Sequence, residues 1–177
     1  MTVASDQILC SPAELERWRE ELTAQRSPSA KSVRVCIGTG CAAKGSRRLY
    51  ALFAEAMEQS DGQVEAVKCV GCHGFCERGP IVVVEPGAIL YQRVEEPDVE
   101  EIFRETVLGG RVVERLLYED PATGERAVTA DGIPFYSAQK RIVLAANGVI
   151  DPTRIEDYVA IGGYAALAKA LTSMQPE

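Results

Sequence analysis

The alternation of hydrophobic and polar positions predicts an ordered series of strands and helices between residues 33 and 108. Strands show a period of two, whereas helices place apolar residues at i, i+3, i+4 and i+7. By these criteria we expect strands near residues 33–37, 64–69, 81–84 and 88–94, and helices near residues 41–57 and 98–108. The run 81–84 is apolar and β-branched throughout, which is typical of a strand buried on both faces.

The order of these elements is strand, helix, strand, loop, strand, strand, helix. It indicates a parallel βαβ unit followed by a β-hairpin and a helix, which is the thioredoxin-like arrangement of an α/β protein. Gly79-Pro80 directly precedes the third strand, where that fold often places a cis-proline. We therefore expect a cis peptide bond at this position.

The chain before residue 32 is predicted to form one amphipathic helix and a linker. Ser11 is a suitable N-cap for a helix over residues 11–25, and Glu14 follows it at the spacing of a capping box. Such a helix packs on the next domain or docks a partner. Residues 26–31 are rich in serine and form the linker.

The character of the chain changes from residue 111 onward. A strand is expected near 112–118, a helix opened by Asp151, and an alanine-rich helix over 164–171. We interpret this part as an extended arm with short helices that packs on the surface of another domain or subunit. The predicted domains are therefore residues 1–31 (helix and linker), 32–110 (thioredoxin-like domain) and 111–177 (arm).

Composition and charge exclude several classes of partner. The formal net charge is −7, and nucleic-acid binding needs a basic surface, so no nucleic-acid partner is expected. No apolar run approaches the roughly 20 residues of a membrane span, and residues 1–9 do not form a secretory signal. A cytoplasmic location is expected, where thiols stay reduced and six cysteines indicate metal ligands or catalytic groups.

Two cysteine pairs carry the candidate chemistry. Cys36 and Cys41 have four residues between them, and Cys72 and Cys76 have three. Each pair follows a predicted strand and lies in a glycine-rich loop. Four thiolates hold a [2Fe–2S] cluster, whose charge is roughly −2 when oxidised and roughly −3 when reduced. The loop glycines can turn backbone amides toward the sulfur atoms.

Alternative interpretations of the cysteines stay open at this point. A structural zinc site would also use four thiolates, although zinc sites favour shorter spacings. A thiol-redox site typically has the Cys-x-x-Cys spacing, which only Cys69 and Cys72 show. We expect Cys69 to be a neighbour of the cluster or part of the core, and Cys10 to be a bystander. His73 is expected beside the ligands or facing solvent, and a lone histidine excludes a Rieske centre.

Several motifs resemble those of one known family. They are Val35-Cys36-Ile37-Gly38-Thr39-Gly40-Cys41, Gly71-Cys72-His73-Gly74-Phe75-Cys76-Glu77 and Gly79-Pro80-Ile81-Val82-Val83-Val84. Together they resemble the thioredoxin-like [2Fe–2S] ferredoxin domain at the N-terminus of NADH-binding flavoprotein subunits of hydrogenases and formate dehydrogenases. Motifs at 133–136, 139–144, 151–152 and 161–164 resemble the lead-in to the flavin domain of the same subunits. Val70 departs from the threonine expected there.

The resemblance implies that Cys36, Cys41, Cys72 and Cys76 hold a [2Fe–2S] cluster that transfers single electrons. It also implies partners in an NAD(H)-linked redox complex: a flavin- and NADH-binding domain and a small ferredoxin-like subunit. FMN, NAD(H) and a [4Fe–4S] cluster are expected only on a missing or partner region, since this sequence holds no phosphate-binding glycine motif. The chain is then not catalytic alone. The alternative function is a redox-sensing or structural metal-binding module that recruits partners.

Overall fold

A computed structural model describes residues 8–175 of the chain. The contacts divide the chain into two compact units, residues 28–152 and the described residues of 1–27 and 153–177. Residues 111–152 therefore pack with the predicted thioredoxin-like region in one unit. The functional division at residues 31 and 110 stays a prediction. Within the described part of the chain, no helix is long and apolar enough to cross a bilayer.

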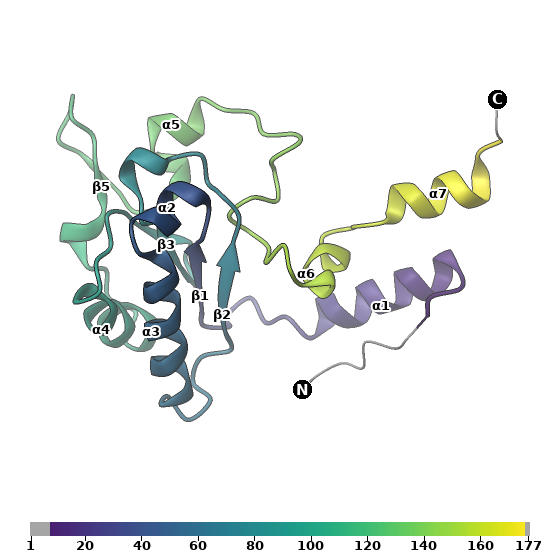
Figure 1. Cartoon of the computed structure of the whole chain (residues 1–177), viewed down its shortest axis with the longest axis horizontal. Coiled ribbons are helices and arrows are strands. Elements are labelled where there is room, and N and C mark those ends of the chain that lie inside the picture. The colour runs from purple at the N-terminus through teal and green to yellow at the C-terminus, as the bar shows by residue number, and fades with distance from the viewer. Residues whose placement is uncertain (1–7, 176–177) are drawn as a thin grey trace. The chain divides into compact units, whose positions relative to one another are not determined.

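The larger unit contains the sheet and the helices that follow its strands (Figure 1). Its strands are β1 (Ser32–Cys36), β2 (Ala66–Val70), β3 (Val82–Glu85), β4 (Ile89–Tyr91), β5 (Tyr118–Glu119) and β6 (Arg126–Ala127). Its α-helices are α2 (Thr39–Ala43), α3 (Ser46–Glu58), α4 (Asp98–Glu101) and α5 (Pro134–Ser137). Short 3₁₀ turns are η1 (Cys76–Arg78), η3 (Glu114–Leu116) and η4 (Ala130–Gly132), and η2 (Ile102–Leu108) is a π-helix.

The main sheet has the strand order β2-β1-β3-β4. β1 pairs with β2 in parallel, and β3 pairs with both β1 and β4 in antiparallel fashion. This topology confirms the predicted thioredoxin-like α/β arrangement, because a parallel crossover is followed by a hairpin on the other side of β1. The predicted cis bond at Gly79-Pro80 is confirmed, and a second cis bond lies at Glu85-Pro86.

One face of the sheet packs against α3. Leu49 and Phe53 of α3 are buried together with Val33, Val35 and other inward residues of the strands. Leu49 and Phe53 are four positions apart, so they lie on one stripe of the helix. Burying a side chain of this size contributes about 1.5–3 kcal/mol, so this stripe fixes the helix on the sheet.

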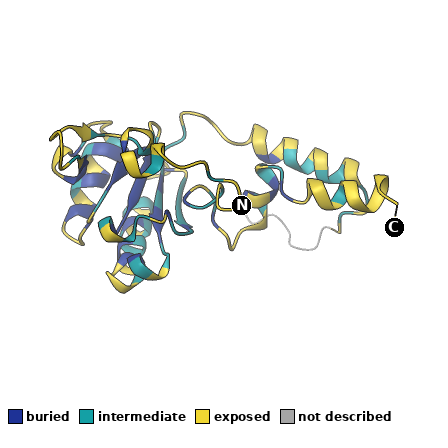
Figure 2. Ribbon diagram, turned by 90° about the horizontal axis from the view of Figure 1, so that it is seen from above, coloured by how far each residue is buried: buried dark blue, intermediate teal, exposed yellow. Residues whose placement is uncertain are grey.

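The opposite face of the sheet is covered by residues from the predicted arm. Val83 and Leu90, which are register partners in β3 and β4, pack with Tyr118 and Ile133. Figure 2 shows the resulting concentration of buried residues on the strands. Val82 and Val84 face the α3 side, so β3 is buried on both faces as the sequence predicts.

A buried hydrogen-bond chain fixes the point where the arm leaves the helix. The Thr106 hydroxyl donates to the Arg111 carbonyl at 2.8 Å, which leaves its oxygen free to accept from the Tyr91 hydroxyl at 2.7 Å. The Val113 amide donates to that same Tyr91 oxygen at 3.0 Å. Each buried polar group is thus paired, which stabilises the turn onto the second sheet face.

Three predicted elements differ in the structure. The helix expected over 41–57 is two helices, because Gly45 takes φ +91° between α2 and α3 and ends the first. The strand expected over 112–118 is instead the turn η3 followed by the two-residue strand β5, because Leu116 and Leu117 pack into the core rather than pair in a ladder. The helix expected over 98–108 widens from α4 into η2.

The smaller unit consists of α1 (Pro12–Ala24), α6 (Ile155–Ala160) and α7 (Ala165–Ser173). The Ser11 hydroxyl accepts from the Glu14 amide, which confirms the predicted N-cap. Arg26 pairs with the buried Asp157 at 2.8 Å. Asp151 is not the N-cap of α6, because that helix begins at Ile155 and Arg154 occupies the cap position.

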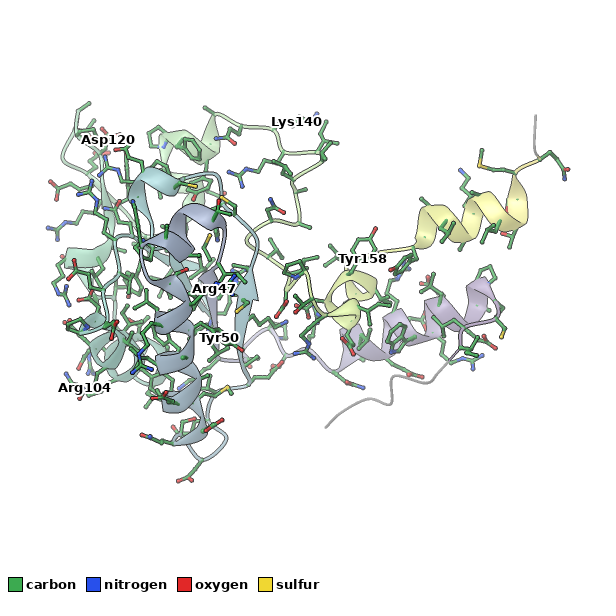
Figure 3. All side chains as sticks on the ribbon, in the orientation of Figure 1. Arg47, Tyr50, Arg104, Asp120, Lys140 and Tyr158 are labelled. Atoms are coloured by element: carbon green, nitrogen blue, oxygen red, sulfur yellow. The ribbon has the colours of Figure 1, made fainter. Side chains whose placement is uncertain are left out.

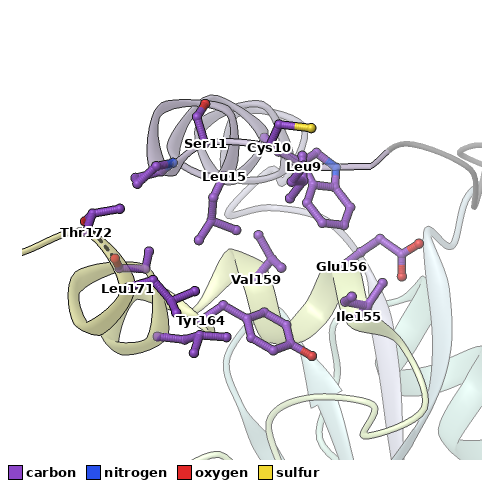
Figure 4. A pocket seen from close by; sticks show the side chains of 14 residues that line it. Leu9, Cys10, Ser11, Leu15, Ile155, Glu156, Val159, Tyr164, Leu171 and Thr172 are labelled. Atoms are coloured by element: carbon purple, nitrogen blue, oxygen red, sulfur yellow. Dashed lines mark hydrogen bonds between the residues drawn. The ribbon is translucent and has the colours of Figure 1, made fainter. Parts of the chain in front are cut away.

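The helices of the smaller unit enclose an apolar groove of about 590 Å³. Figure 4 shows Leu15 of α1 facing Val159, Tyr164 and Leu171 across it. The amphipathic face predicted for residues 11–25 therefore packs partly against helices from the other end of the chain.

Candidate metal centre

The first cysteine loop joins β1 to α2. Cys36 is the last residue of β1, and Cys41 lies within α2, as the sequence predicts. Both are almost fully buried, with exposed fractions of 0% and 1%. The nearby backbone N–H groups of His73 and Gly38 lower the pKa of Cys36, and that of Ile81 lowers the pKa of Cys41. Such donors stabilise negative charge on sulfur.

The second cysteine loop joins β2 to β3. Cys72 follows β2 and Cys76 opens η1, and their Sγ atoms lie 3.5 Å apart. The Gly74 amide donates to the Cys72 Sγ atom at 3.2 Å. Gly74 has φ +85°, a conformation that side chains disfavour, so glycine is needed to turn this amide toward sulfur.

The two loops approach each other so closely that only glycine fits between them. A Cβ atom on Gly38 would lie 2.7 Å from the Cys72 Cβ, and one on Gly79 would lie 2.5 Å from the Cys41 Sγ. Lys44 holds the loops together from outside, because its Nζ atom donates to the carbonyls of Cys76 at 3.0 Å and of Gly79 at 3.2 Å. The fold therefore brings the two predicted pairs into one site.

The thiols perturb each other. A hydrogen bond from the Cys41 thiol lowers the pKa of Cys36 to about 6, although burial opposes this. The same hydrogen bond, followed by burial, raises the pKa of Cys41. Burial raises the pKa of Cys72, and the Gly74 amide partly offsets it. A metal bound by both sulfur atoms would relieve the repulsion that opposes ionisation of the second thiol.

The donor set fits a binuclear iron–sulfur centre. Two thiolates on one tetrahedral metal, with bonds of about 2.3 Å, lie about 3.8 Å apart. The Cys72–Cys76 separation of 3.5 Å is close to this value, so this pair suits one iron. Among residues 8–175, no group of three or more His, Cys, Asp or Glu gathers around one point suited to a single metal ion. The assignment of the four ligands stays a prediction.

The other cysteines and the histidine lie in different surroundings. Cys69 is on β2 and half-buried, and burial, followed by the charge of Asp151, raises its pKa. Cys10 is exposed at the start of α1. His73 is 8% exposed, so the solvent-facing alternative is wrong. Burial, followed by the charges of Arg34 and Arg141, lowers the pKa of His73 to about 4.

Sequence reasoning missed a segment that packs over the second cysteine loop. Residues 133–148, called here the covering segment, place Phe135 in a stack on Phe75 at 4.5 Å between ring centroids. The Tyr136 ring meets that of His73 edge-on at 6.3 Å. The aromatic residues at 135–136 stand out in the sequence, but their spacing gave no indication of which loop they contact.

Gly148 allows the covering segment to lie on His73. It has φ +81°, and a Cβ atom there would lie 2.5 Å from the His73 Cε1 atom. We expect Gly148→Ala to lower the free energy of unfolding by about 2–4 kcal/mol, from backbone strain plus this clash. Chemical denaturation followed by circular dichroism measures the change.

Gly124→Ala is the matched control for this variant. Gly124 has φ +73°, but a Cβ atom there meets nothing within 4 Å. The free energy of unfolding of Gly124→Ala should therefore fall by only about 1 kcal/mol, because of backbone strain alone. Equal losses in the two variants would show that contact with His73 contributes nothing.

Comparison with known proteins places the cysteine loops in a recognised context. The family model for "Thioredoxin-like [2Fe-2S] ferredoxin" matches residues 23–107. A 2Fe-2S ferredoxin of Aquifex aeolicus (strain VF5) is 39% identical over 80 residues, which are 44% of this chain and 71% of that protein. A 2Fe-2S ferredoxin of Clostridium pasteurianum is 40% identical over 77 residues, which are 43% of this chain and 76% of that protein.

The crystal structure of the wild-type thioredoxin-like [2Fe-2S] ferredoxin from Aquifex aeolicus has a TM-score of 0.48 and 31% sequence identity to this chain. The match covers 52% of this chain and 99% of that one. The covering segment lies beyond residue 107, where the family match ends.

Proposed function

Since this chain belongs to the thioredoxin-like [2Fe–2S] ferredoxin family, we propose that Cys36, Cys41, Cys72 and Cys76 hold its cluster and that the cluster relays electrons beside a flavin. Ferredoxin-like electron transfer through a [2Fe–2S] cluster is the function of the family. The observation that carries the ligand assignment is the meeting of two cysteine loops across Gly38 and Gly79.

The chain's own residues perform three tasks in this function. The thiolates of the four cysteines ligate iron, and a [2Fe–2S] centre supplies a one-electron couple when bound. Backbone N–H groups, including that of Gly74, donate to sulfur and stabilise negative charge there. The buried positions of Cys36 and Cys41 exclude water from one side of the site. Cys72 and Cys76, which are less buried, would hold the other side of the centre.

We further propose that the electron partner is a flavin- and NADH-binding polypeptide in a multi-subunit oxidoreductase. This proposal is supported by the motifs between residues 133 and 164 that resemble the lead-in to such a flavin domain. FMN handles the two-electron chemistry of NAD(H), and a one-electron centre beside it can accept or store single electrons. The chain itself is then an electron-transfer part that does not oxidise NADH alone.

Reduction by NADH tests this proposal. We expect dithionite to bleach the visible absorbance of the anaerobic iron-loaded protein, and NADH alone to leave it unchanged. Addition of the flavin- and NADH-binding polypeptide from the same cell in catalytic amounts should allow NADH to bleach it at least tenfold faster than without that polypeptide. The measurement is absorbance against time.

Two outcomes contradict different parts of the proposal. Bleaching by dithionite without any acceleration by the flavin polypeptide would overturn the NAD(H)-linked partner and leave the ferredoxin-like role. A protein that binds one zinc and no acid-labile sulfide would overturn the electron-transfer role and favour a structural module.

A further inference from the structure

Arg141 binds the second cysteine loop from the covering segment. Its Nη2 atom donates to the His73 carbonyl at 2.5 Å, although 67 residues lie between the two positions in the sequence. Figure 3 shows the neighbouring Lys140 on the loop that follows α5. Lys140 is exposed, whereas Arg141 is half-buried, so two adjacent cations have different surroundings.

The hydrogen bond from Arg141 acts on the peptide group that faces a predicted ligand. The His73 carbonyl and the Gly74 amide belong to the same peptide unit. Its oxygen accepts from Arg141, and its N–H donates to the Cys72 Sγ atom at 3.2 Å. A guanidinium on the carbonyl oxygen polarises the peptide and strengthens the bond that the N–H donates, because linked hydrogen bonds reinforce each other.

The guanidinium is itself held in position. It lies over the Tyr136 ring, with 5.1 Å between the Arg141 Cζ atom and the ring centroid. Its Nε atom donates to the Gln139 side-chain oxygen at 3.3 Å. Since Gly74 has φ +85° and no side chain to restrict it, a clamp on the carbonyl oxygen keeps this peptide oriented toward sulfur.

We propose that Arg141 is a positioning residue that raises the reduction potential of the [2Fe–2S] centre by orienting and polarising the Gly74 amide. This inference rests on the proposed ligation by Cys72. Reduction changes the charge of the centre from roughly −2 to roughly −3, so a stronger N–H donor and a nearby cation stabilise the reduced form more than the oxidised form. The residue lies beyond residue 107, where the family match ends.

The potential of the iron-loaded protein tests the proposal, with each variant measured by spectroelectrochemical titration at 0.1 M and 0.5 M NaCl. We expect Arg141→Ala to reduce the equilibrium constant for one-electron reduction about tenfold, which is a fall of about 59 mV. Arg141→Lys keeps a cation that can reach the carbonyl and should stay within about threefold of the wild type.

Lys140→Ala is the matched control, because it removes the same charge from the adjacent exposed position. Lys140→Ala should change the equilibrium constant for one-electron reduction less than about twofold at 0.1 M NaCl. The change should vanish at 0.5 M NaCl, where exposed charges are screened. The Arg141→Ala effect should persist at the higher salt concentration. If Arg141→Ala loses its iron, Arg141→Gln removes the charge but keeps a polar side chain, and the same direction of change is expected.

The outcomes separate this inference from the proposed function. Equal shifts in the alanine variants of Arg141 and Lys140, or an unchanged potential in Arg141→Ala or Arg141→Gln, would overturn the role of Arg141. In those cases the wild type would still hold iron and sulfide, so the electron-transfer function would stand. A wild-type protein without iron and sulfide would overturn the proposed function itself.

Discussion

Replacing Cys36 or Cys72 with alanine is expected to abolish the iron–sulfur centre. The wild type should contain about two irons and two acid-labile sulfides per chain, and each variant less than roughly one tenth of that. Cys36 lies in the first cysteine loop and Cys72 in the second. Either variant therefore leaves one of the two irons with a single protein thiolate. Iron and sulfide analysis, with the visible spectrum, measures the loss. Alanine is preferred to serine, because a serine oxygen can still ligate iron.

Cys69→Ala and Cys10→Ala are the matched controls. Cys69 lies on β2, with Asp151 and Arg47 as its charged neighbours, and Cys10 is exposed on the smaller unit. Both variants should keep the iron, the sulfide and the visible spectrum of the wild type. A wild-type spectrum in Cys36→Ala or Cys72→Ala, or loss of the spectrum in Cys69→Ala, would show that the ligand set is wrong.

Gly38→Ala is expected to prevent cluster binding without removing any ligand. Gly38 has φ −54°, which alanine adopts freely, so the backbone itself imposes no strain. The added Cβ would lie 2.7 Å from the Cys72 Cβ and 3.1 Å from its Cα. Because backbone atoms cannot yield as a flexible side chain does, the loops must separate. We expect the iron content to fall at least about fivefold. The free energy of unfolding of the iron-free protein should fall by about 1–3 kcal/mol.

Gly71→Ala provides the control for this variant. Gly71 directly precedes Cys72, and a Cβ there would meet the Asn147 side-chain oxygen at 3.3 Å. That side chain can move by a few tenths of an ångström, so iron content should stay within about twofold of the wild type. Full iron content in Gly38→Ala would indicate that the two loops do not need their close approach to hold the centre.

The sequence alone predicted much of the sheet and the candidate ligands. Period-two runs identified the strands that carry Cys36 and precede Cys72, because alternation is a local property of a half-buried strand. The run 81–84 indicated burial on both faces, and β3 is indeed buried on both. Ser11 and Glu14 predicted the start of α1, because capping depends on residues within one turn.

Local pattern failed where the outcome depends on distant contacts. The run 112–118 has strand-like composition, yet Leu116 and Leu117 fill the core from a turn. Asp151 is a good N-cap residue, but α6 begins further along the chain, at Ile155. Intrinsic preference is a weak determinant in such places, and tertiary packing overrides it.

By itself, the sequence determined that two glycine-rich cysteine pairs follow two strands, because spacing and periodicity are written in neighbouring residues. Only the tertiary structure decided that the pairs meet across Gly38. It also decided that Tyr118 and Ile133 cover the second sheet face and that residues 133–148 cover the second cysteine loop. The hydrogen bond from Arg141 to the His73 carbonyl is likewise a feature that only the tertiary structure decided. Such contacts join residues far apart in the chain, and no local period records which surfaces will be brought together.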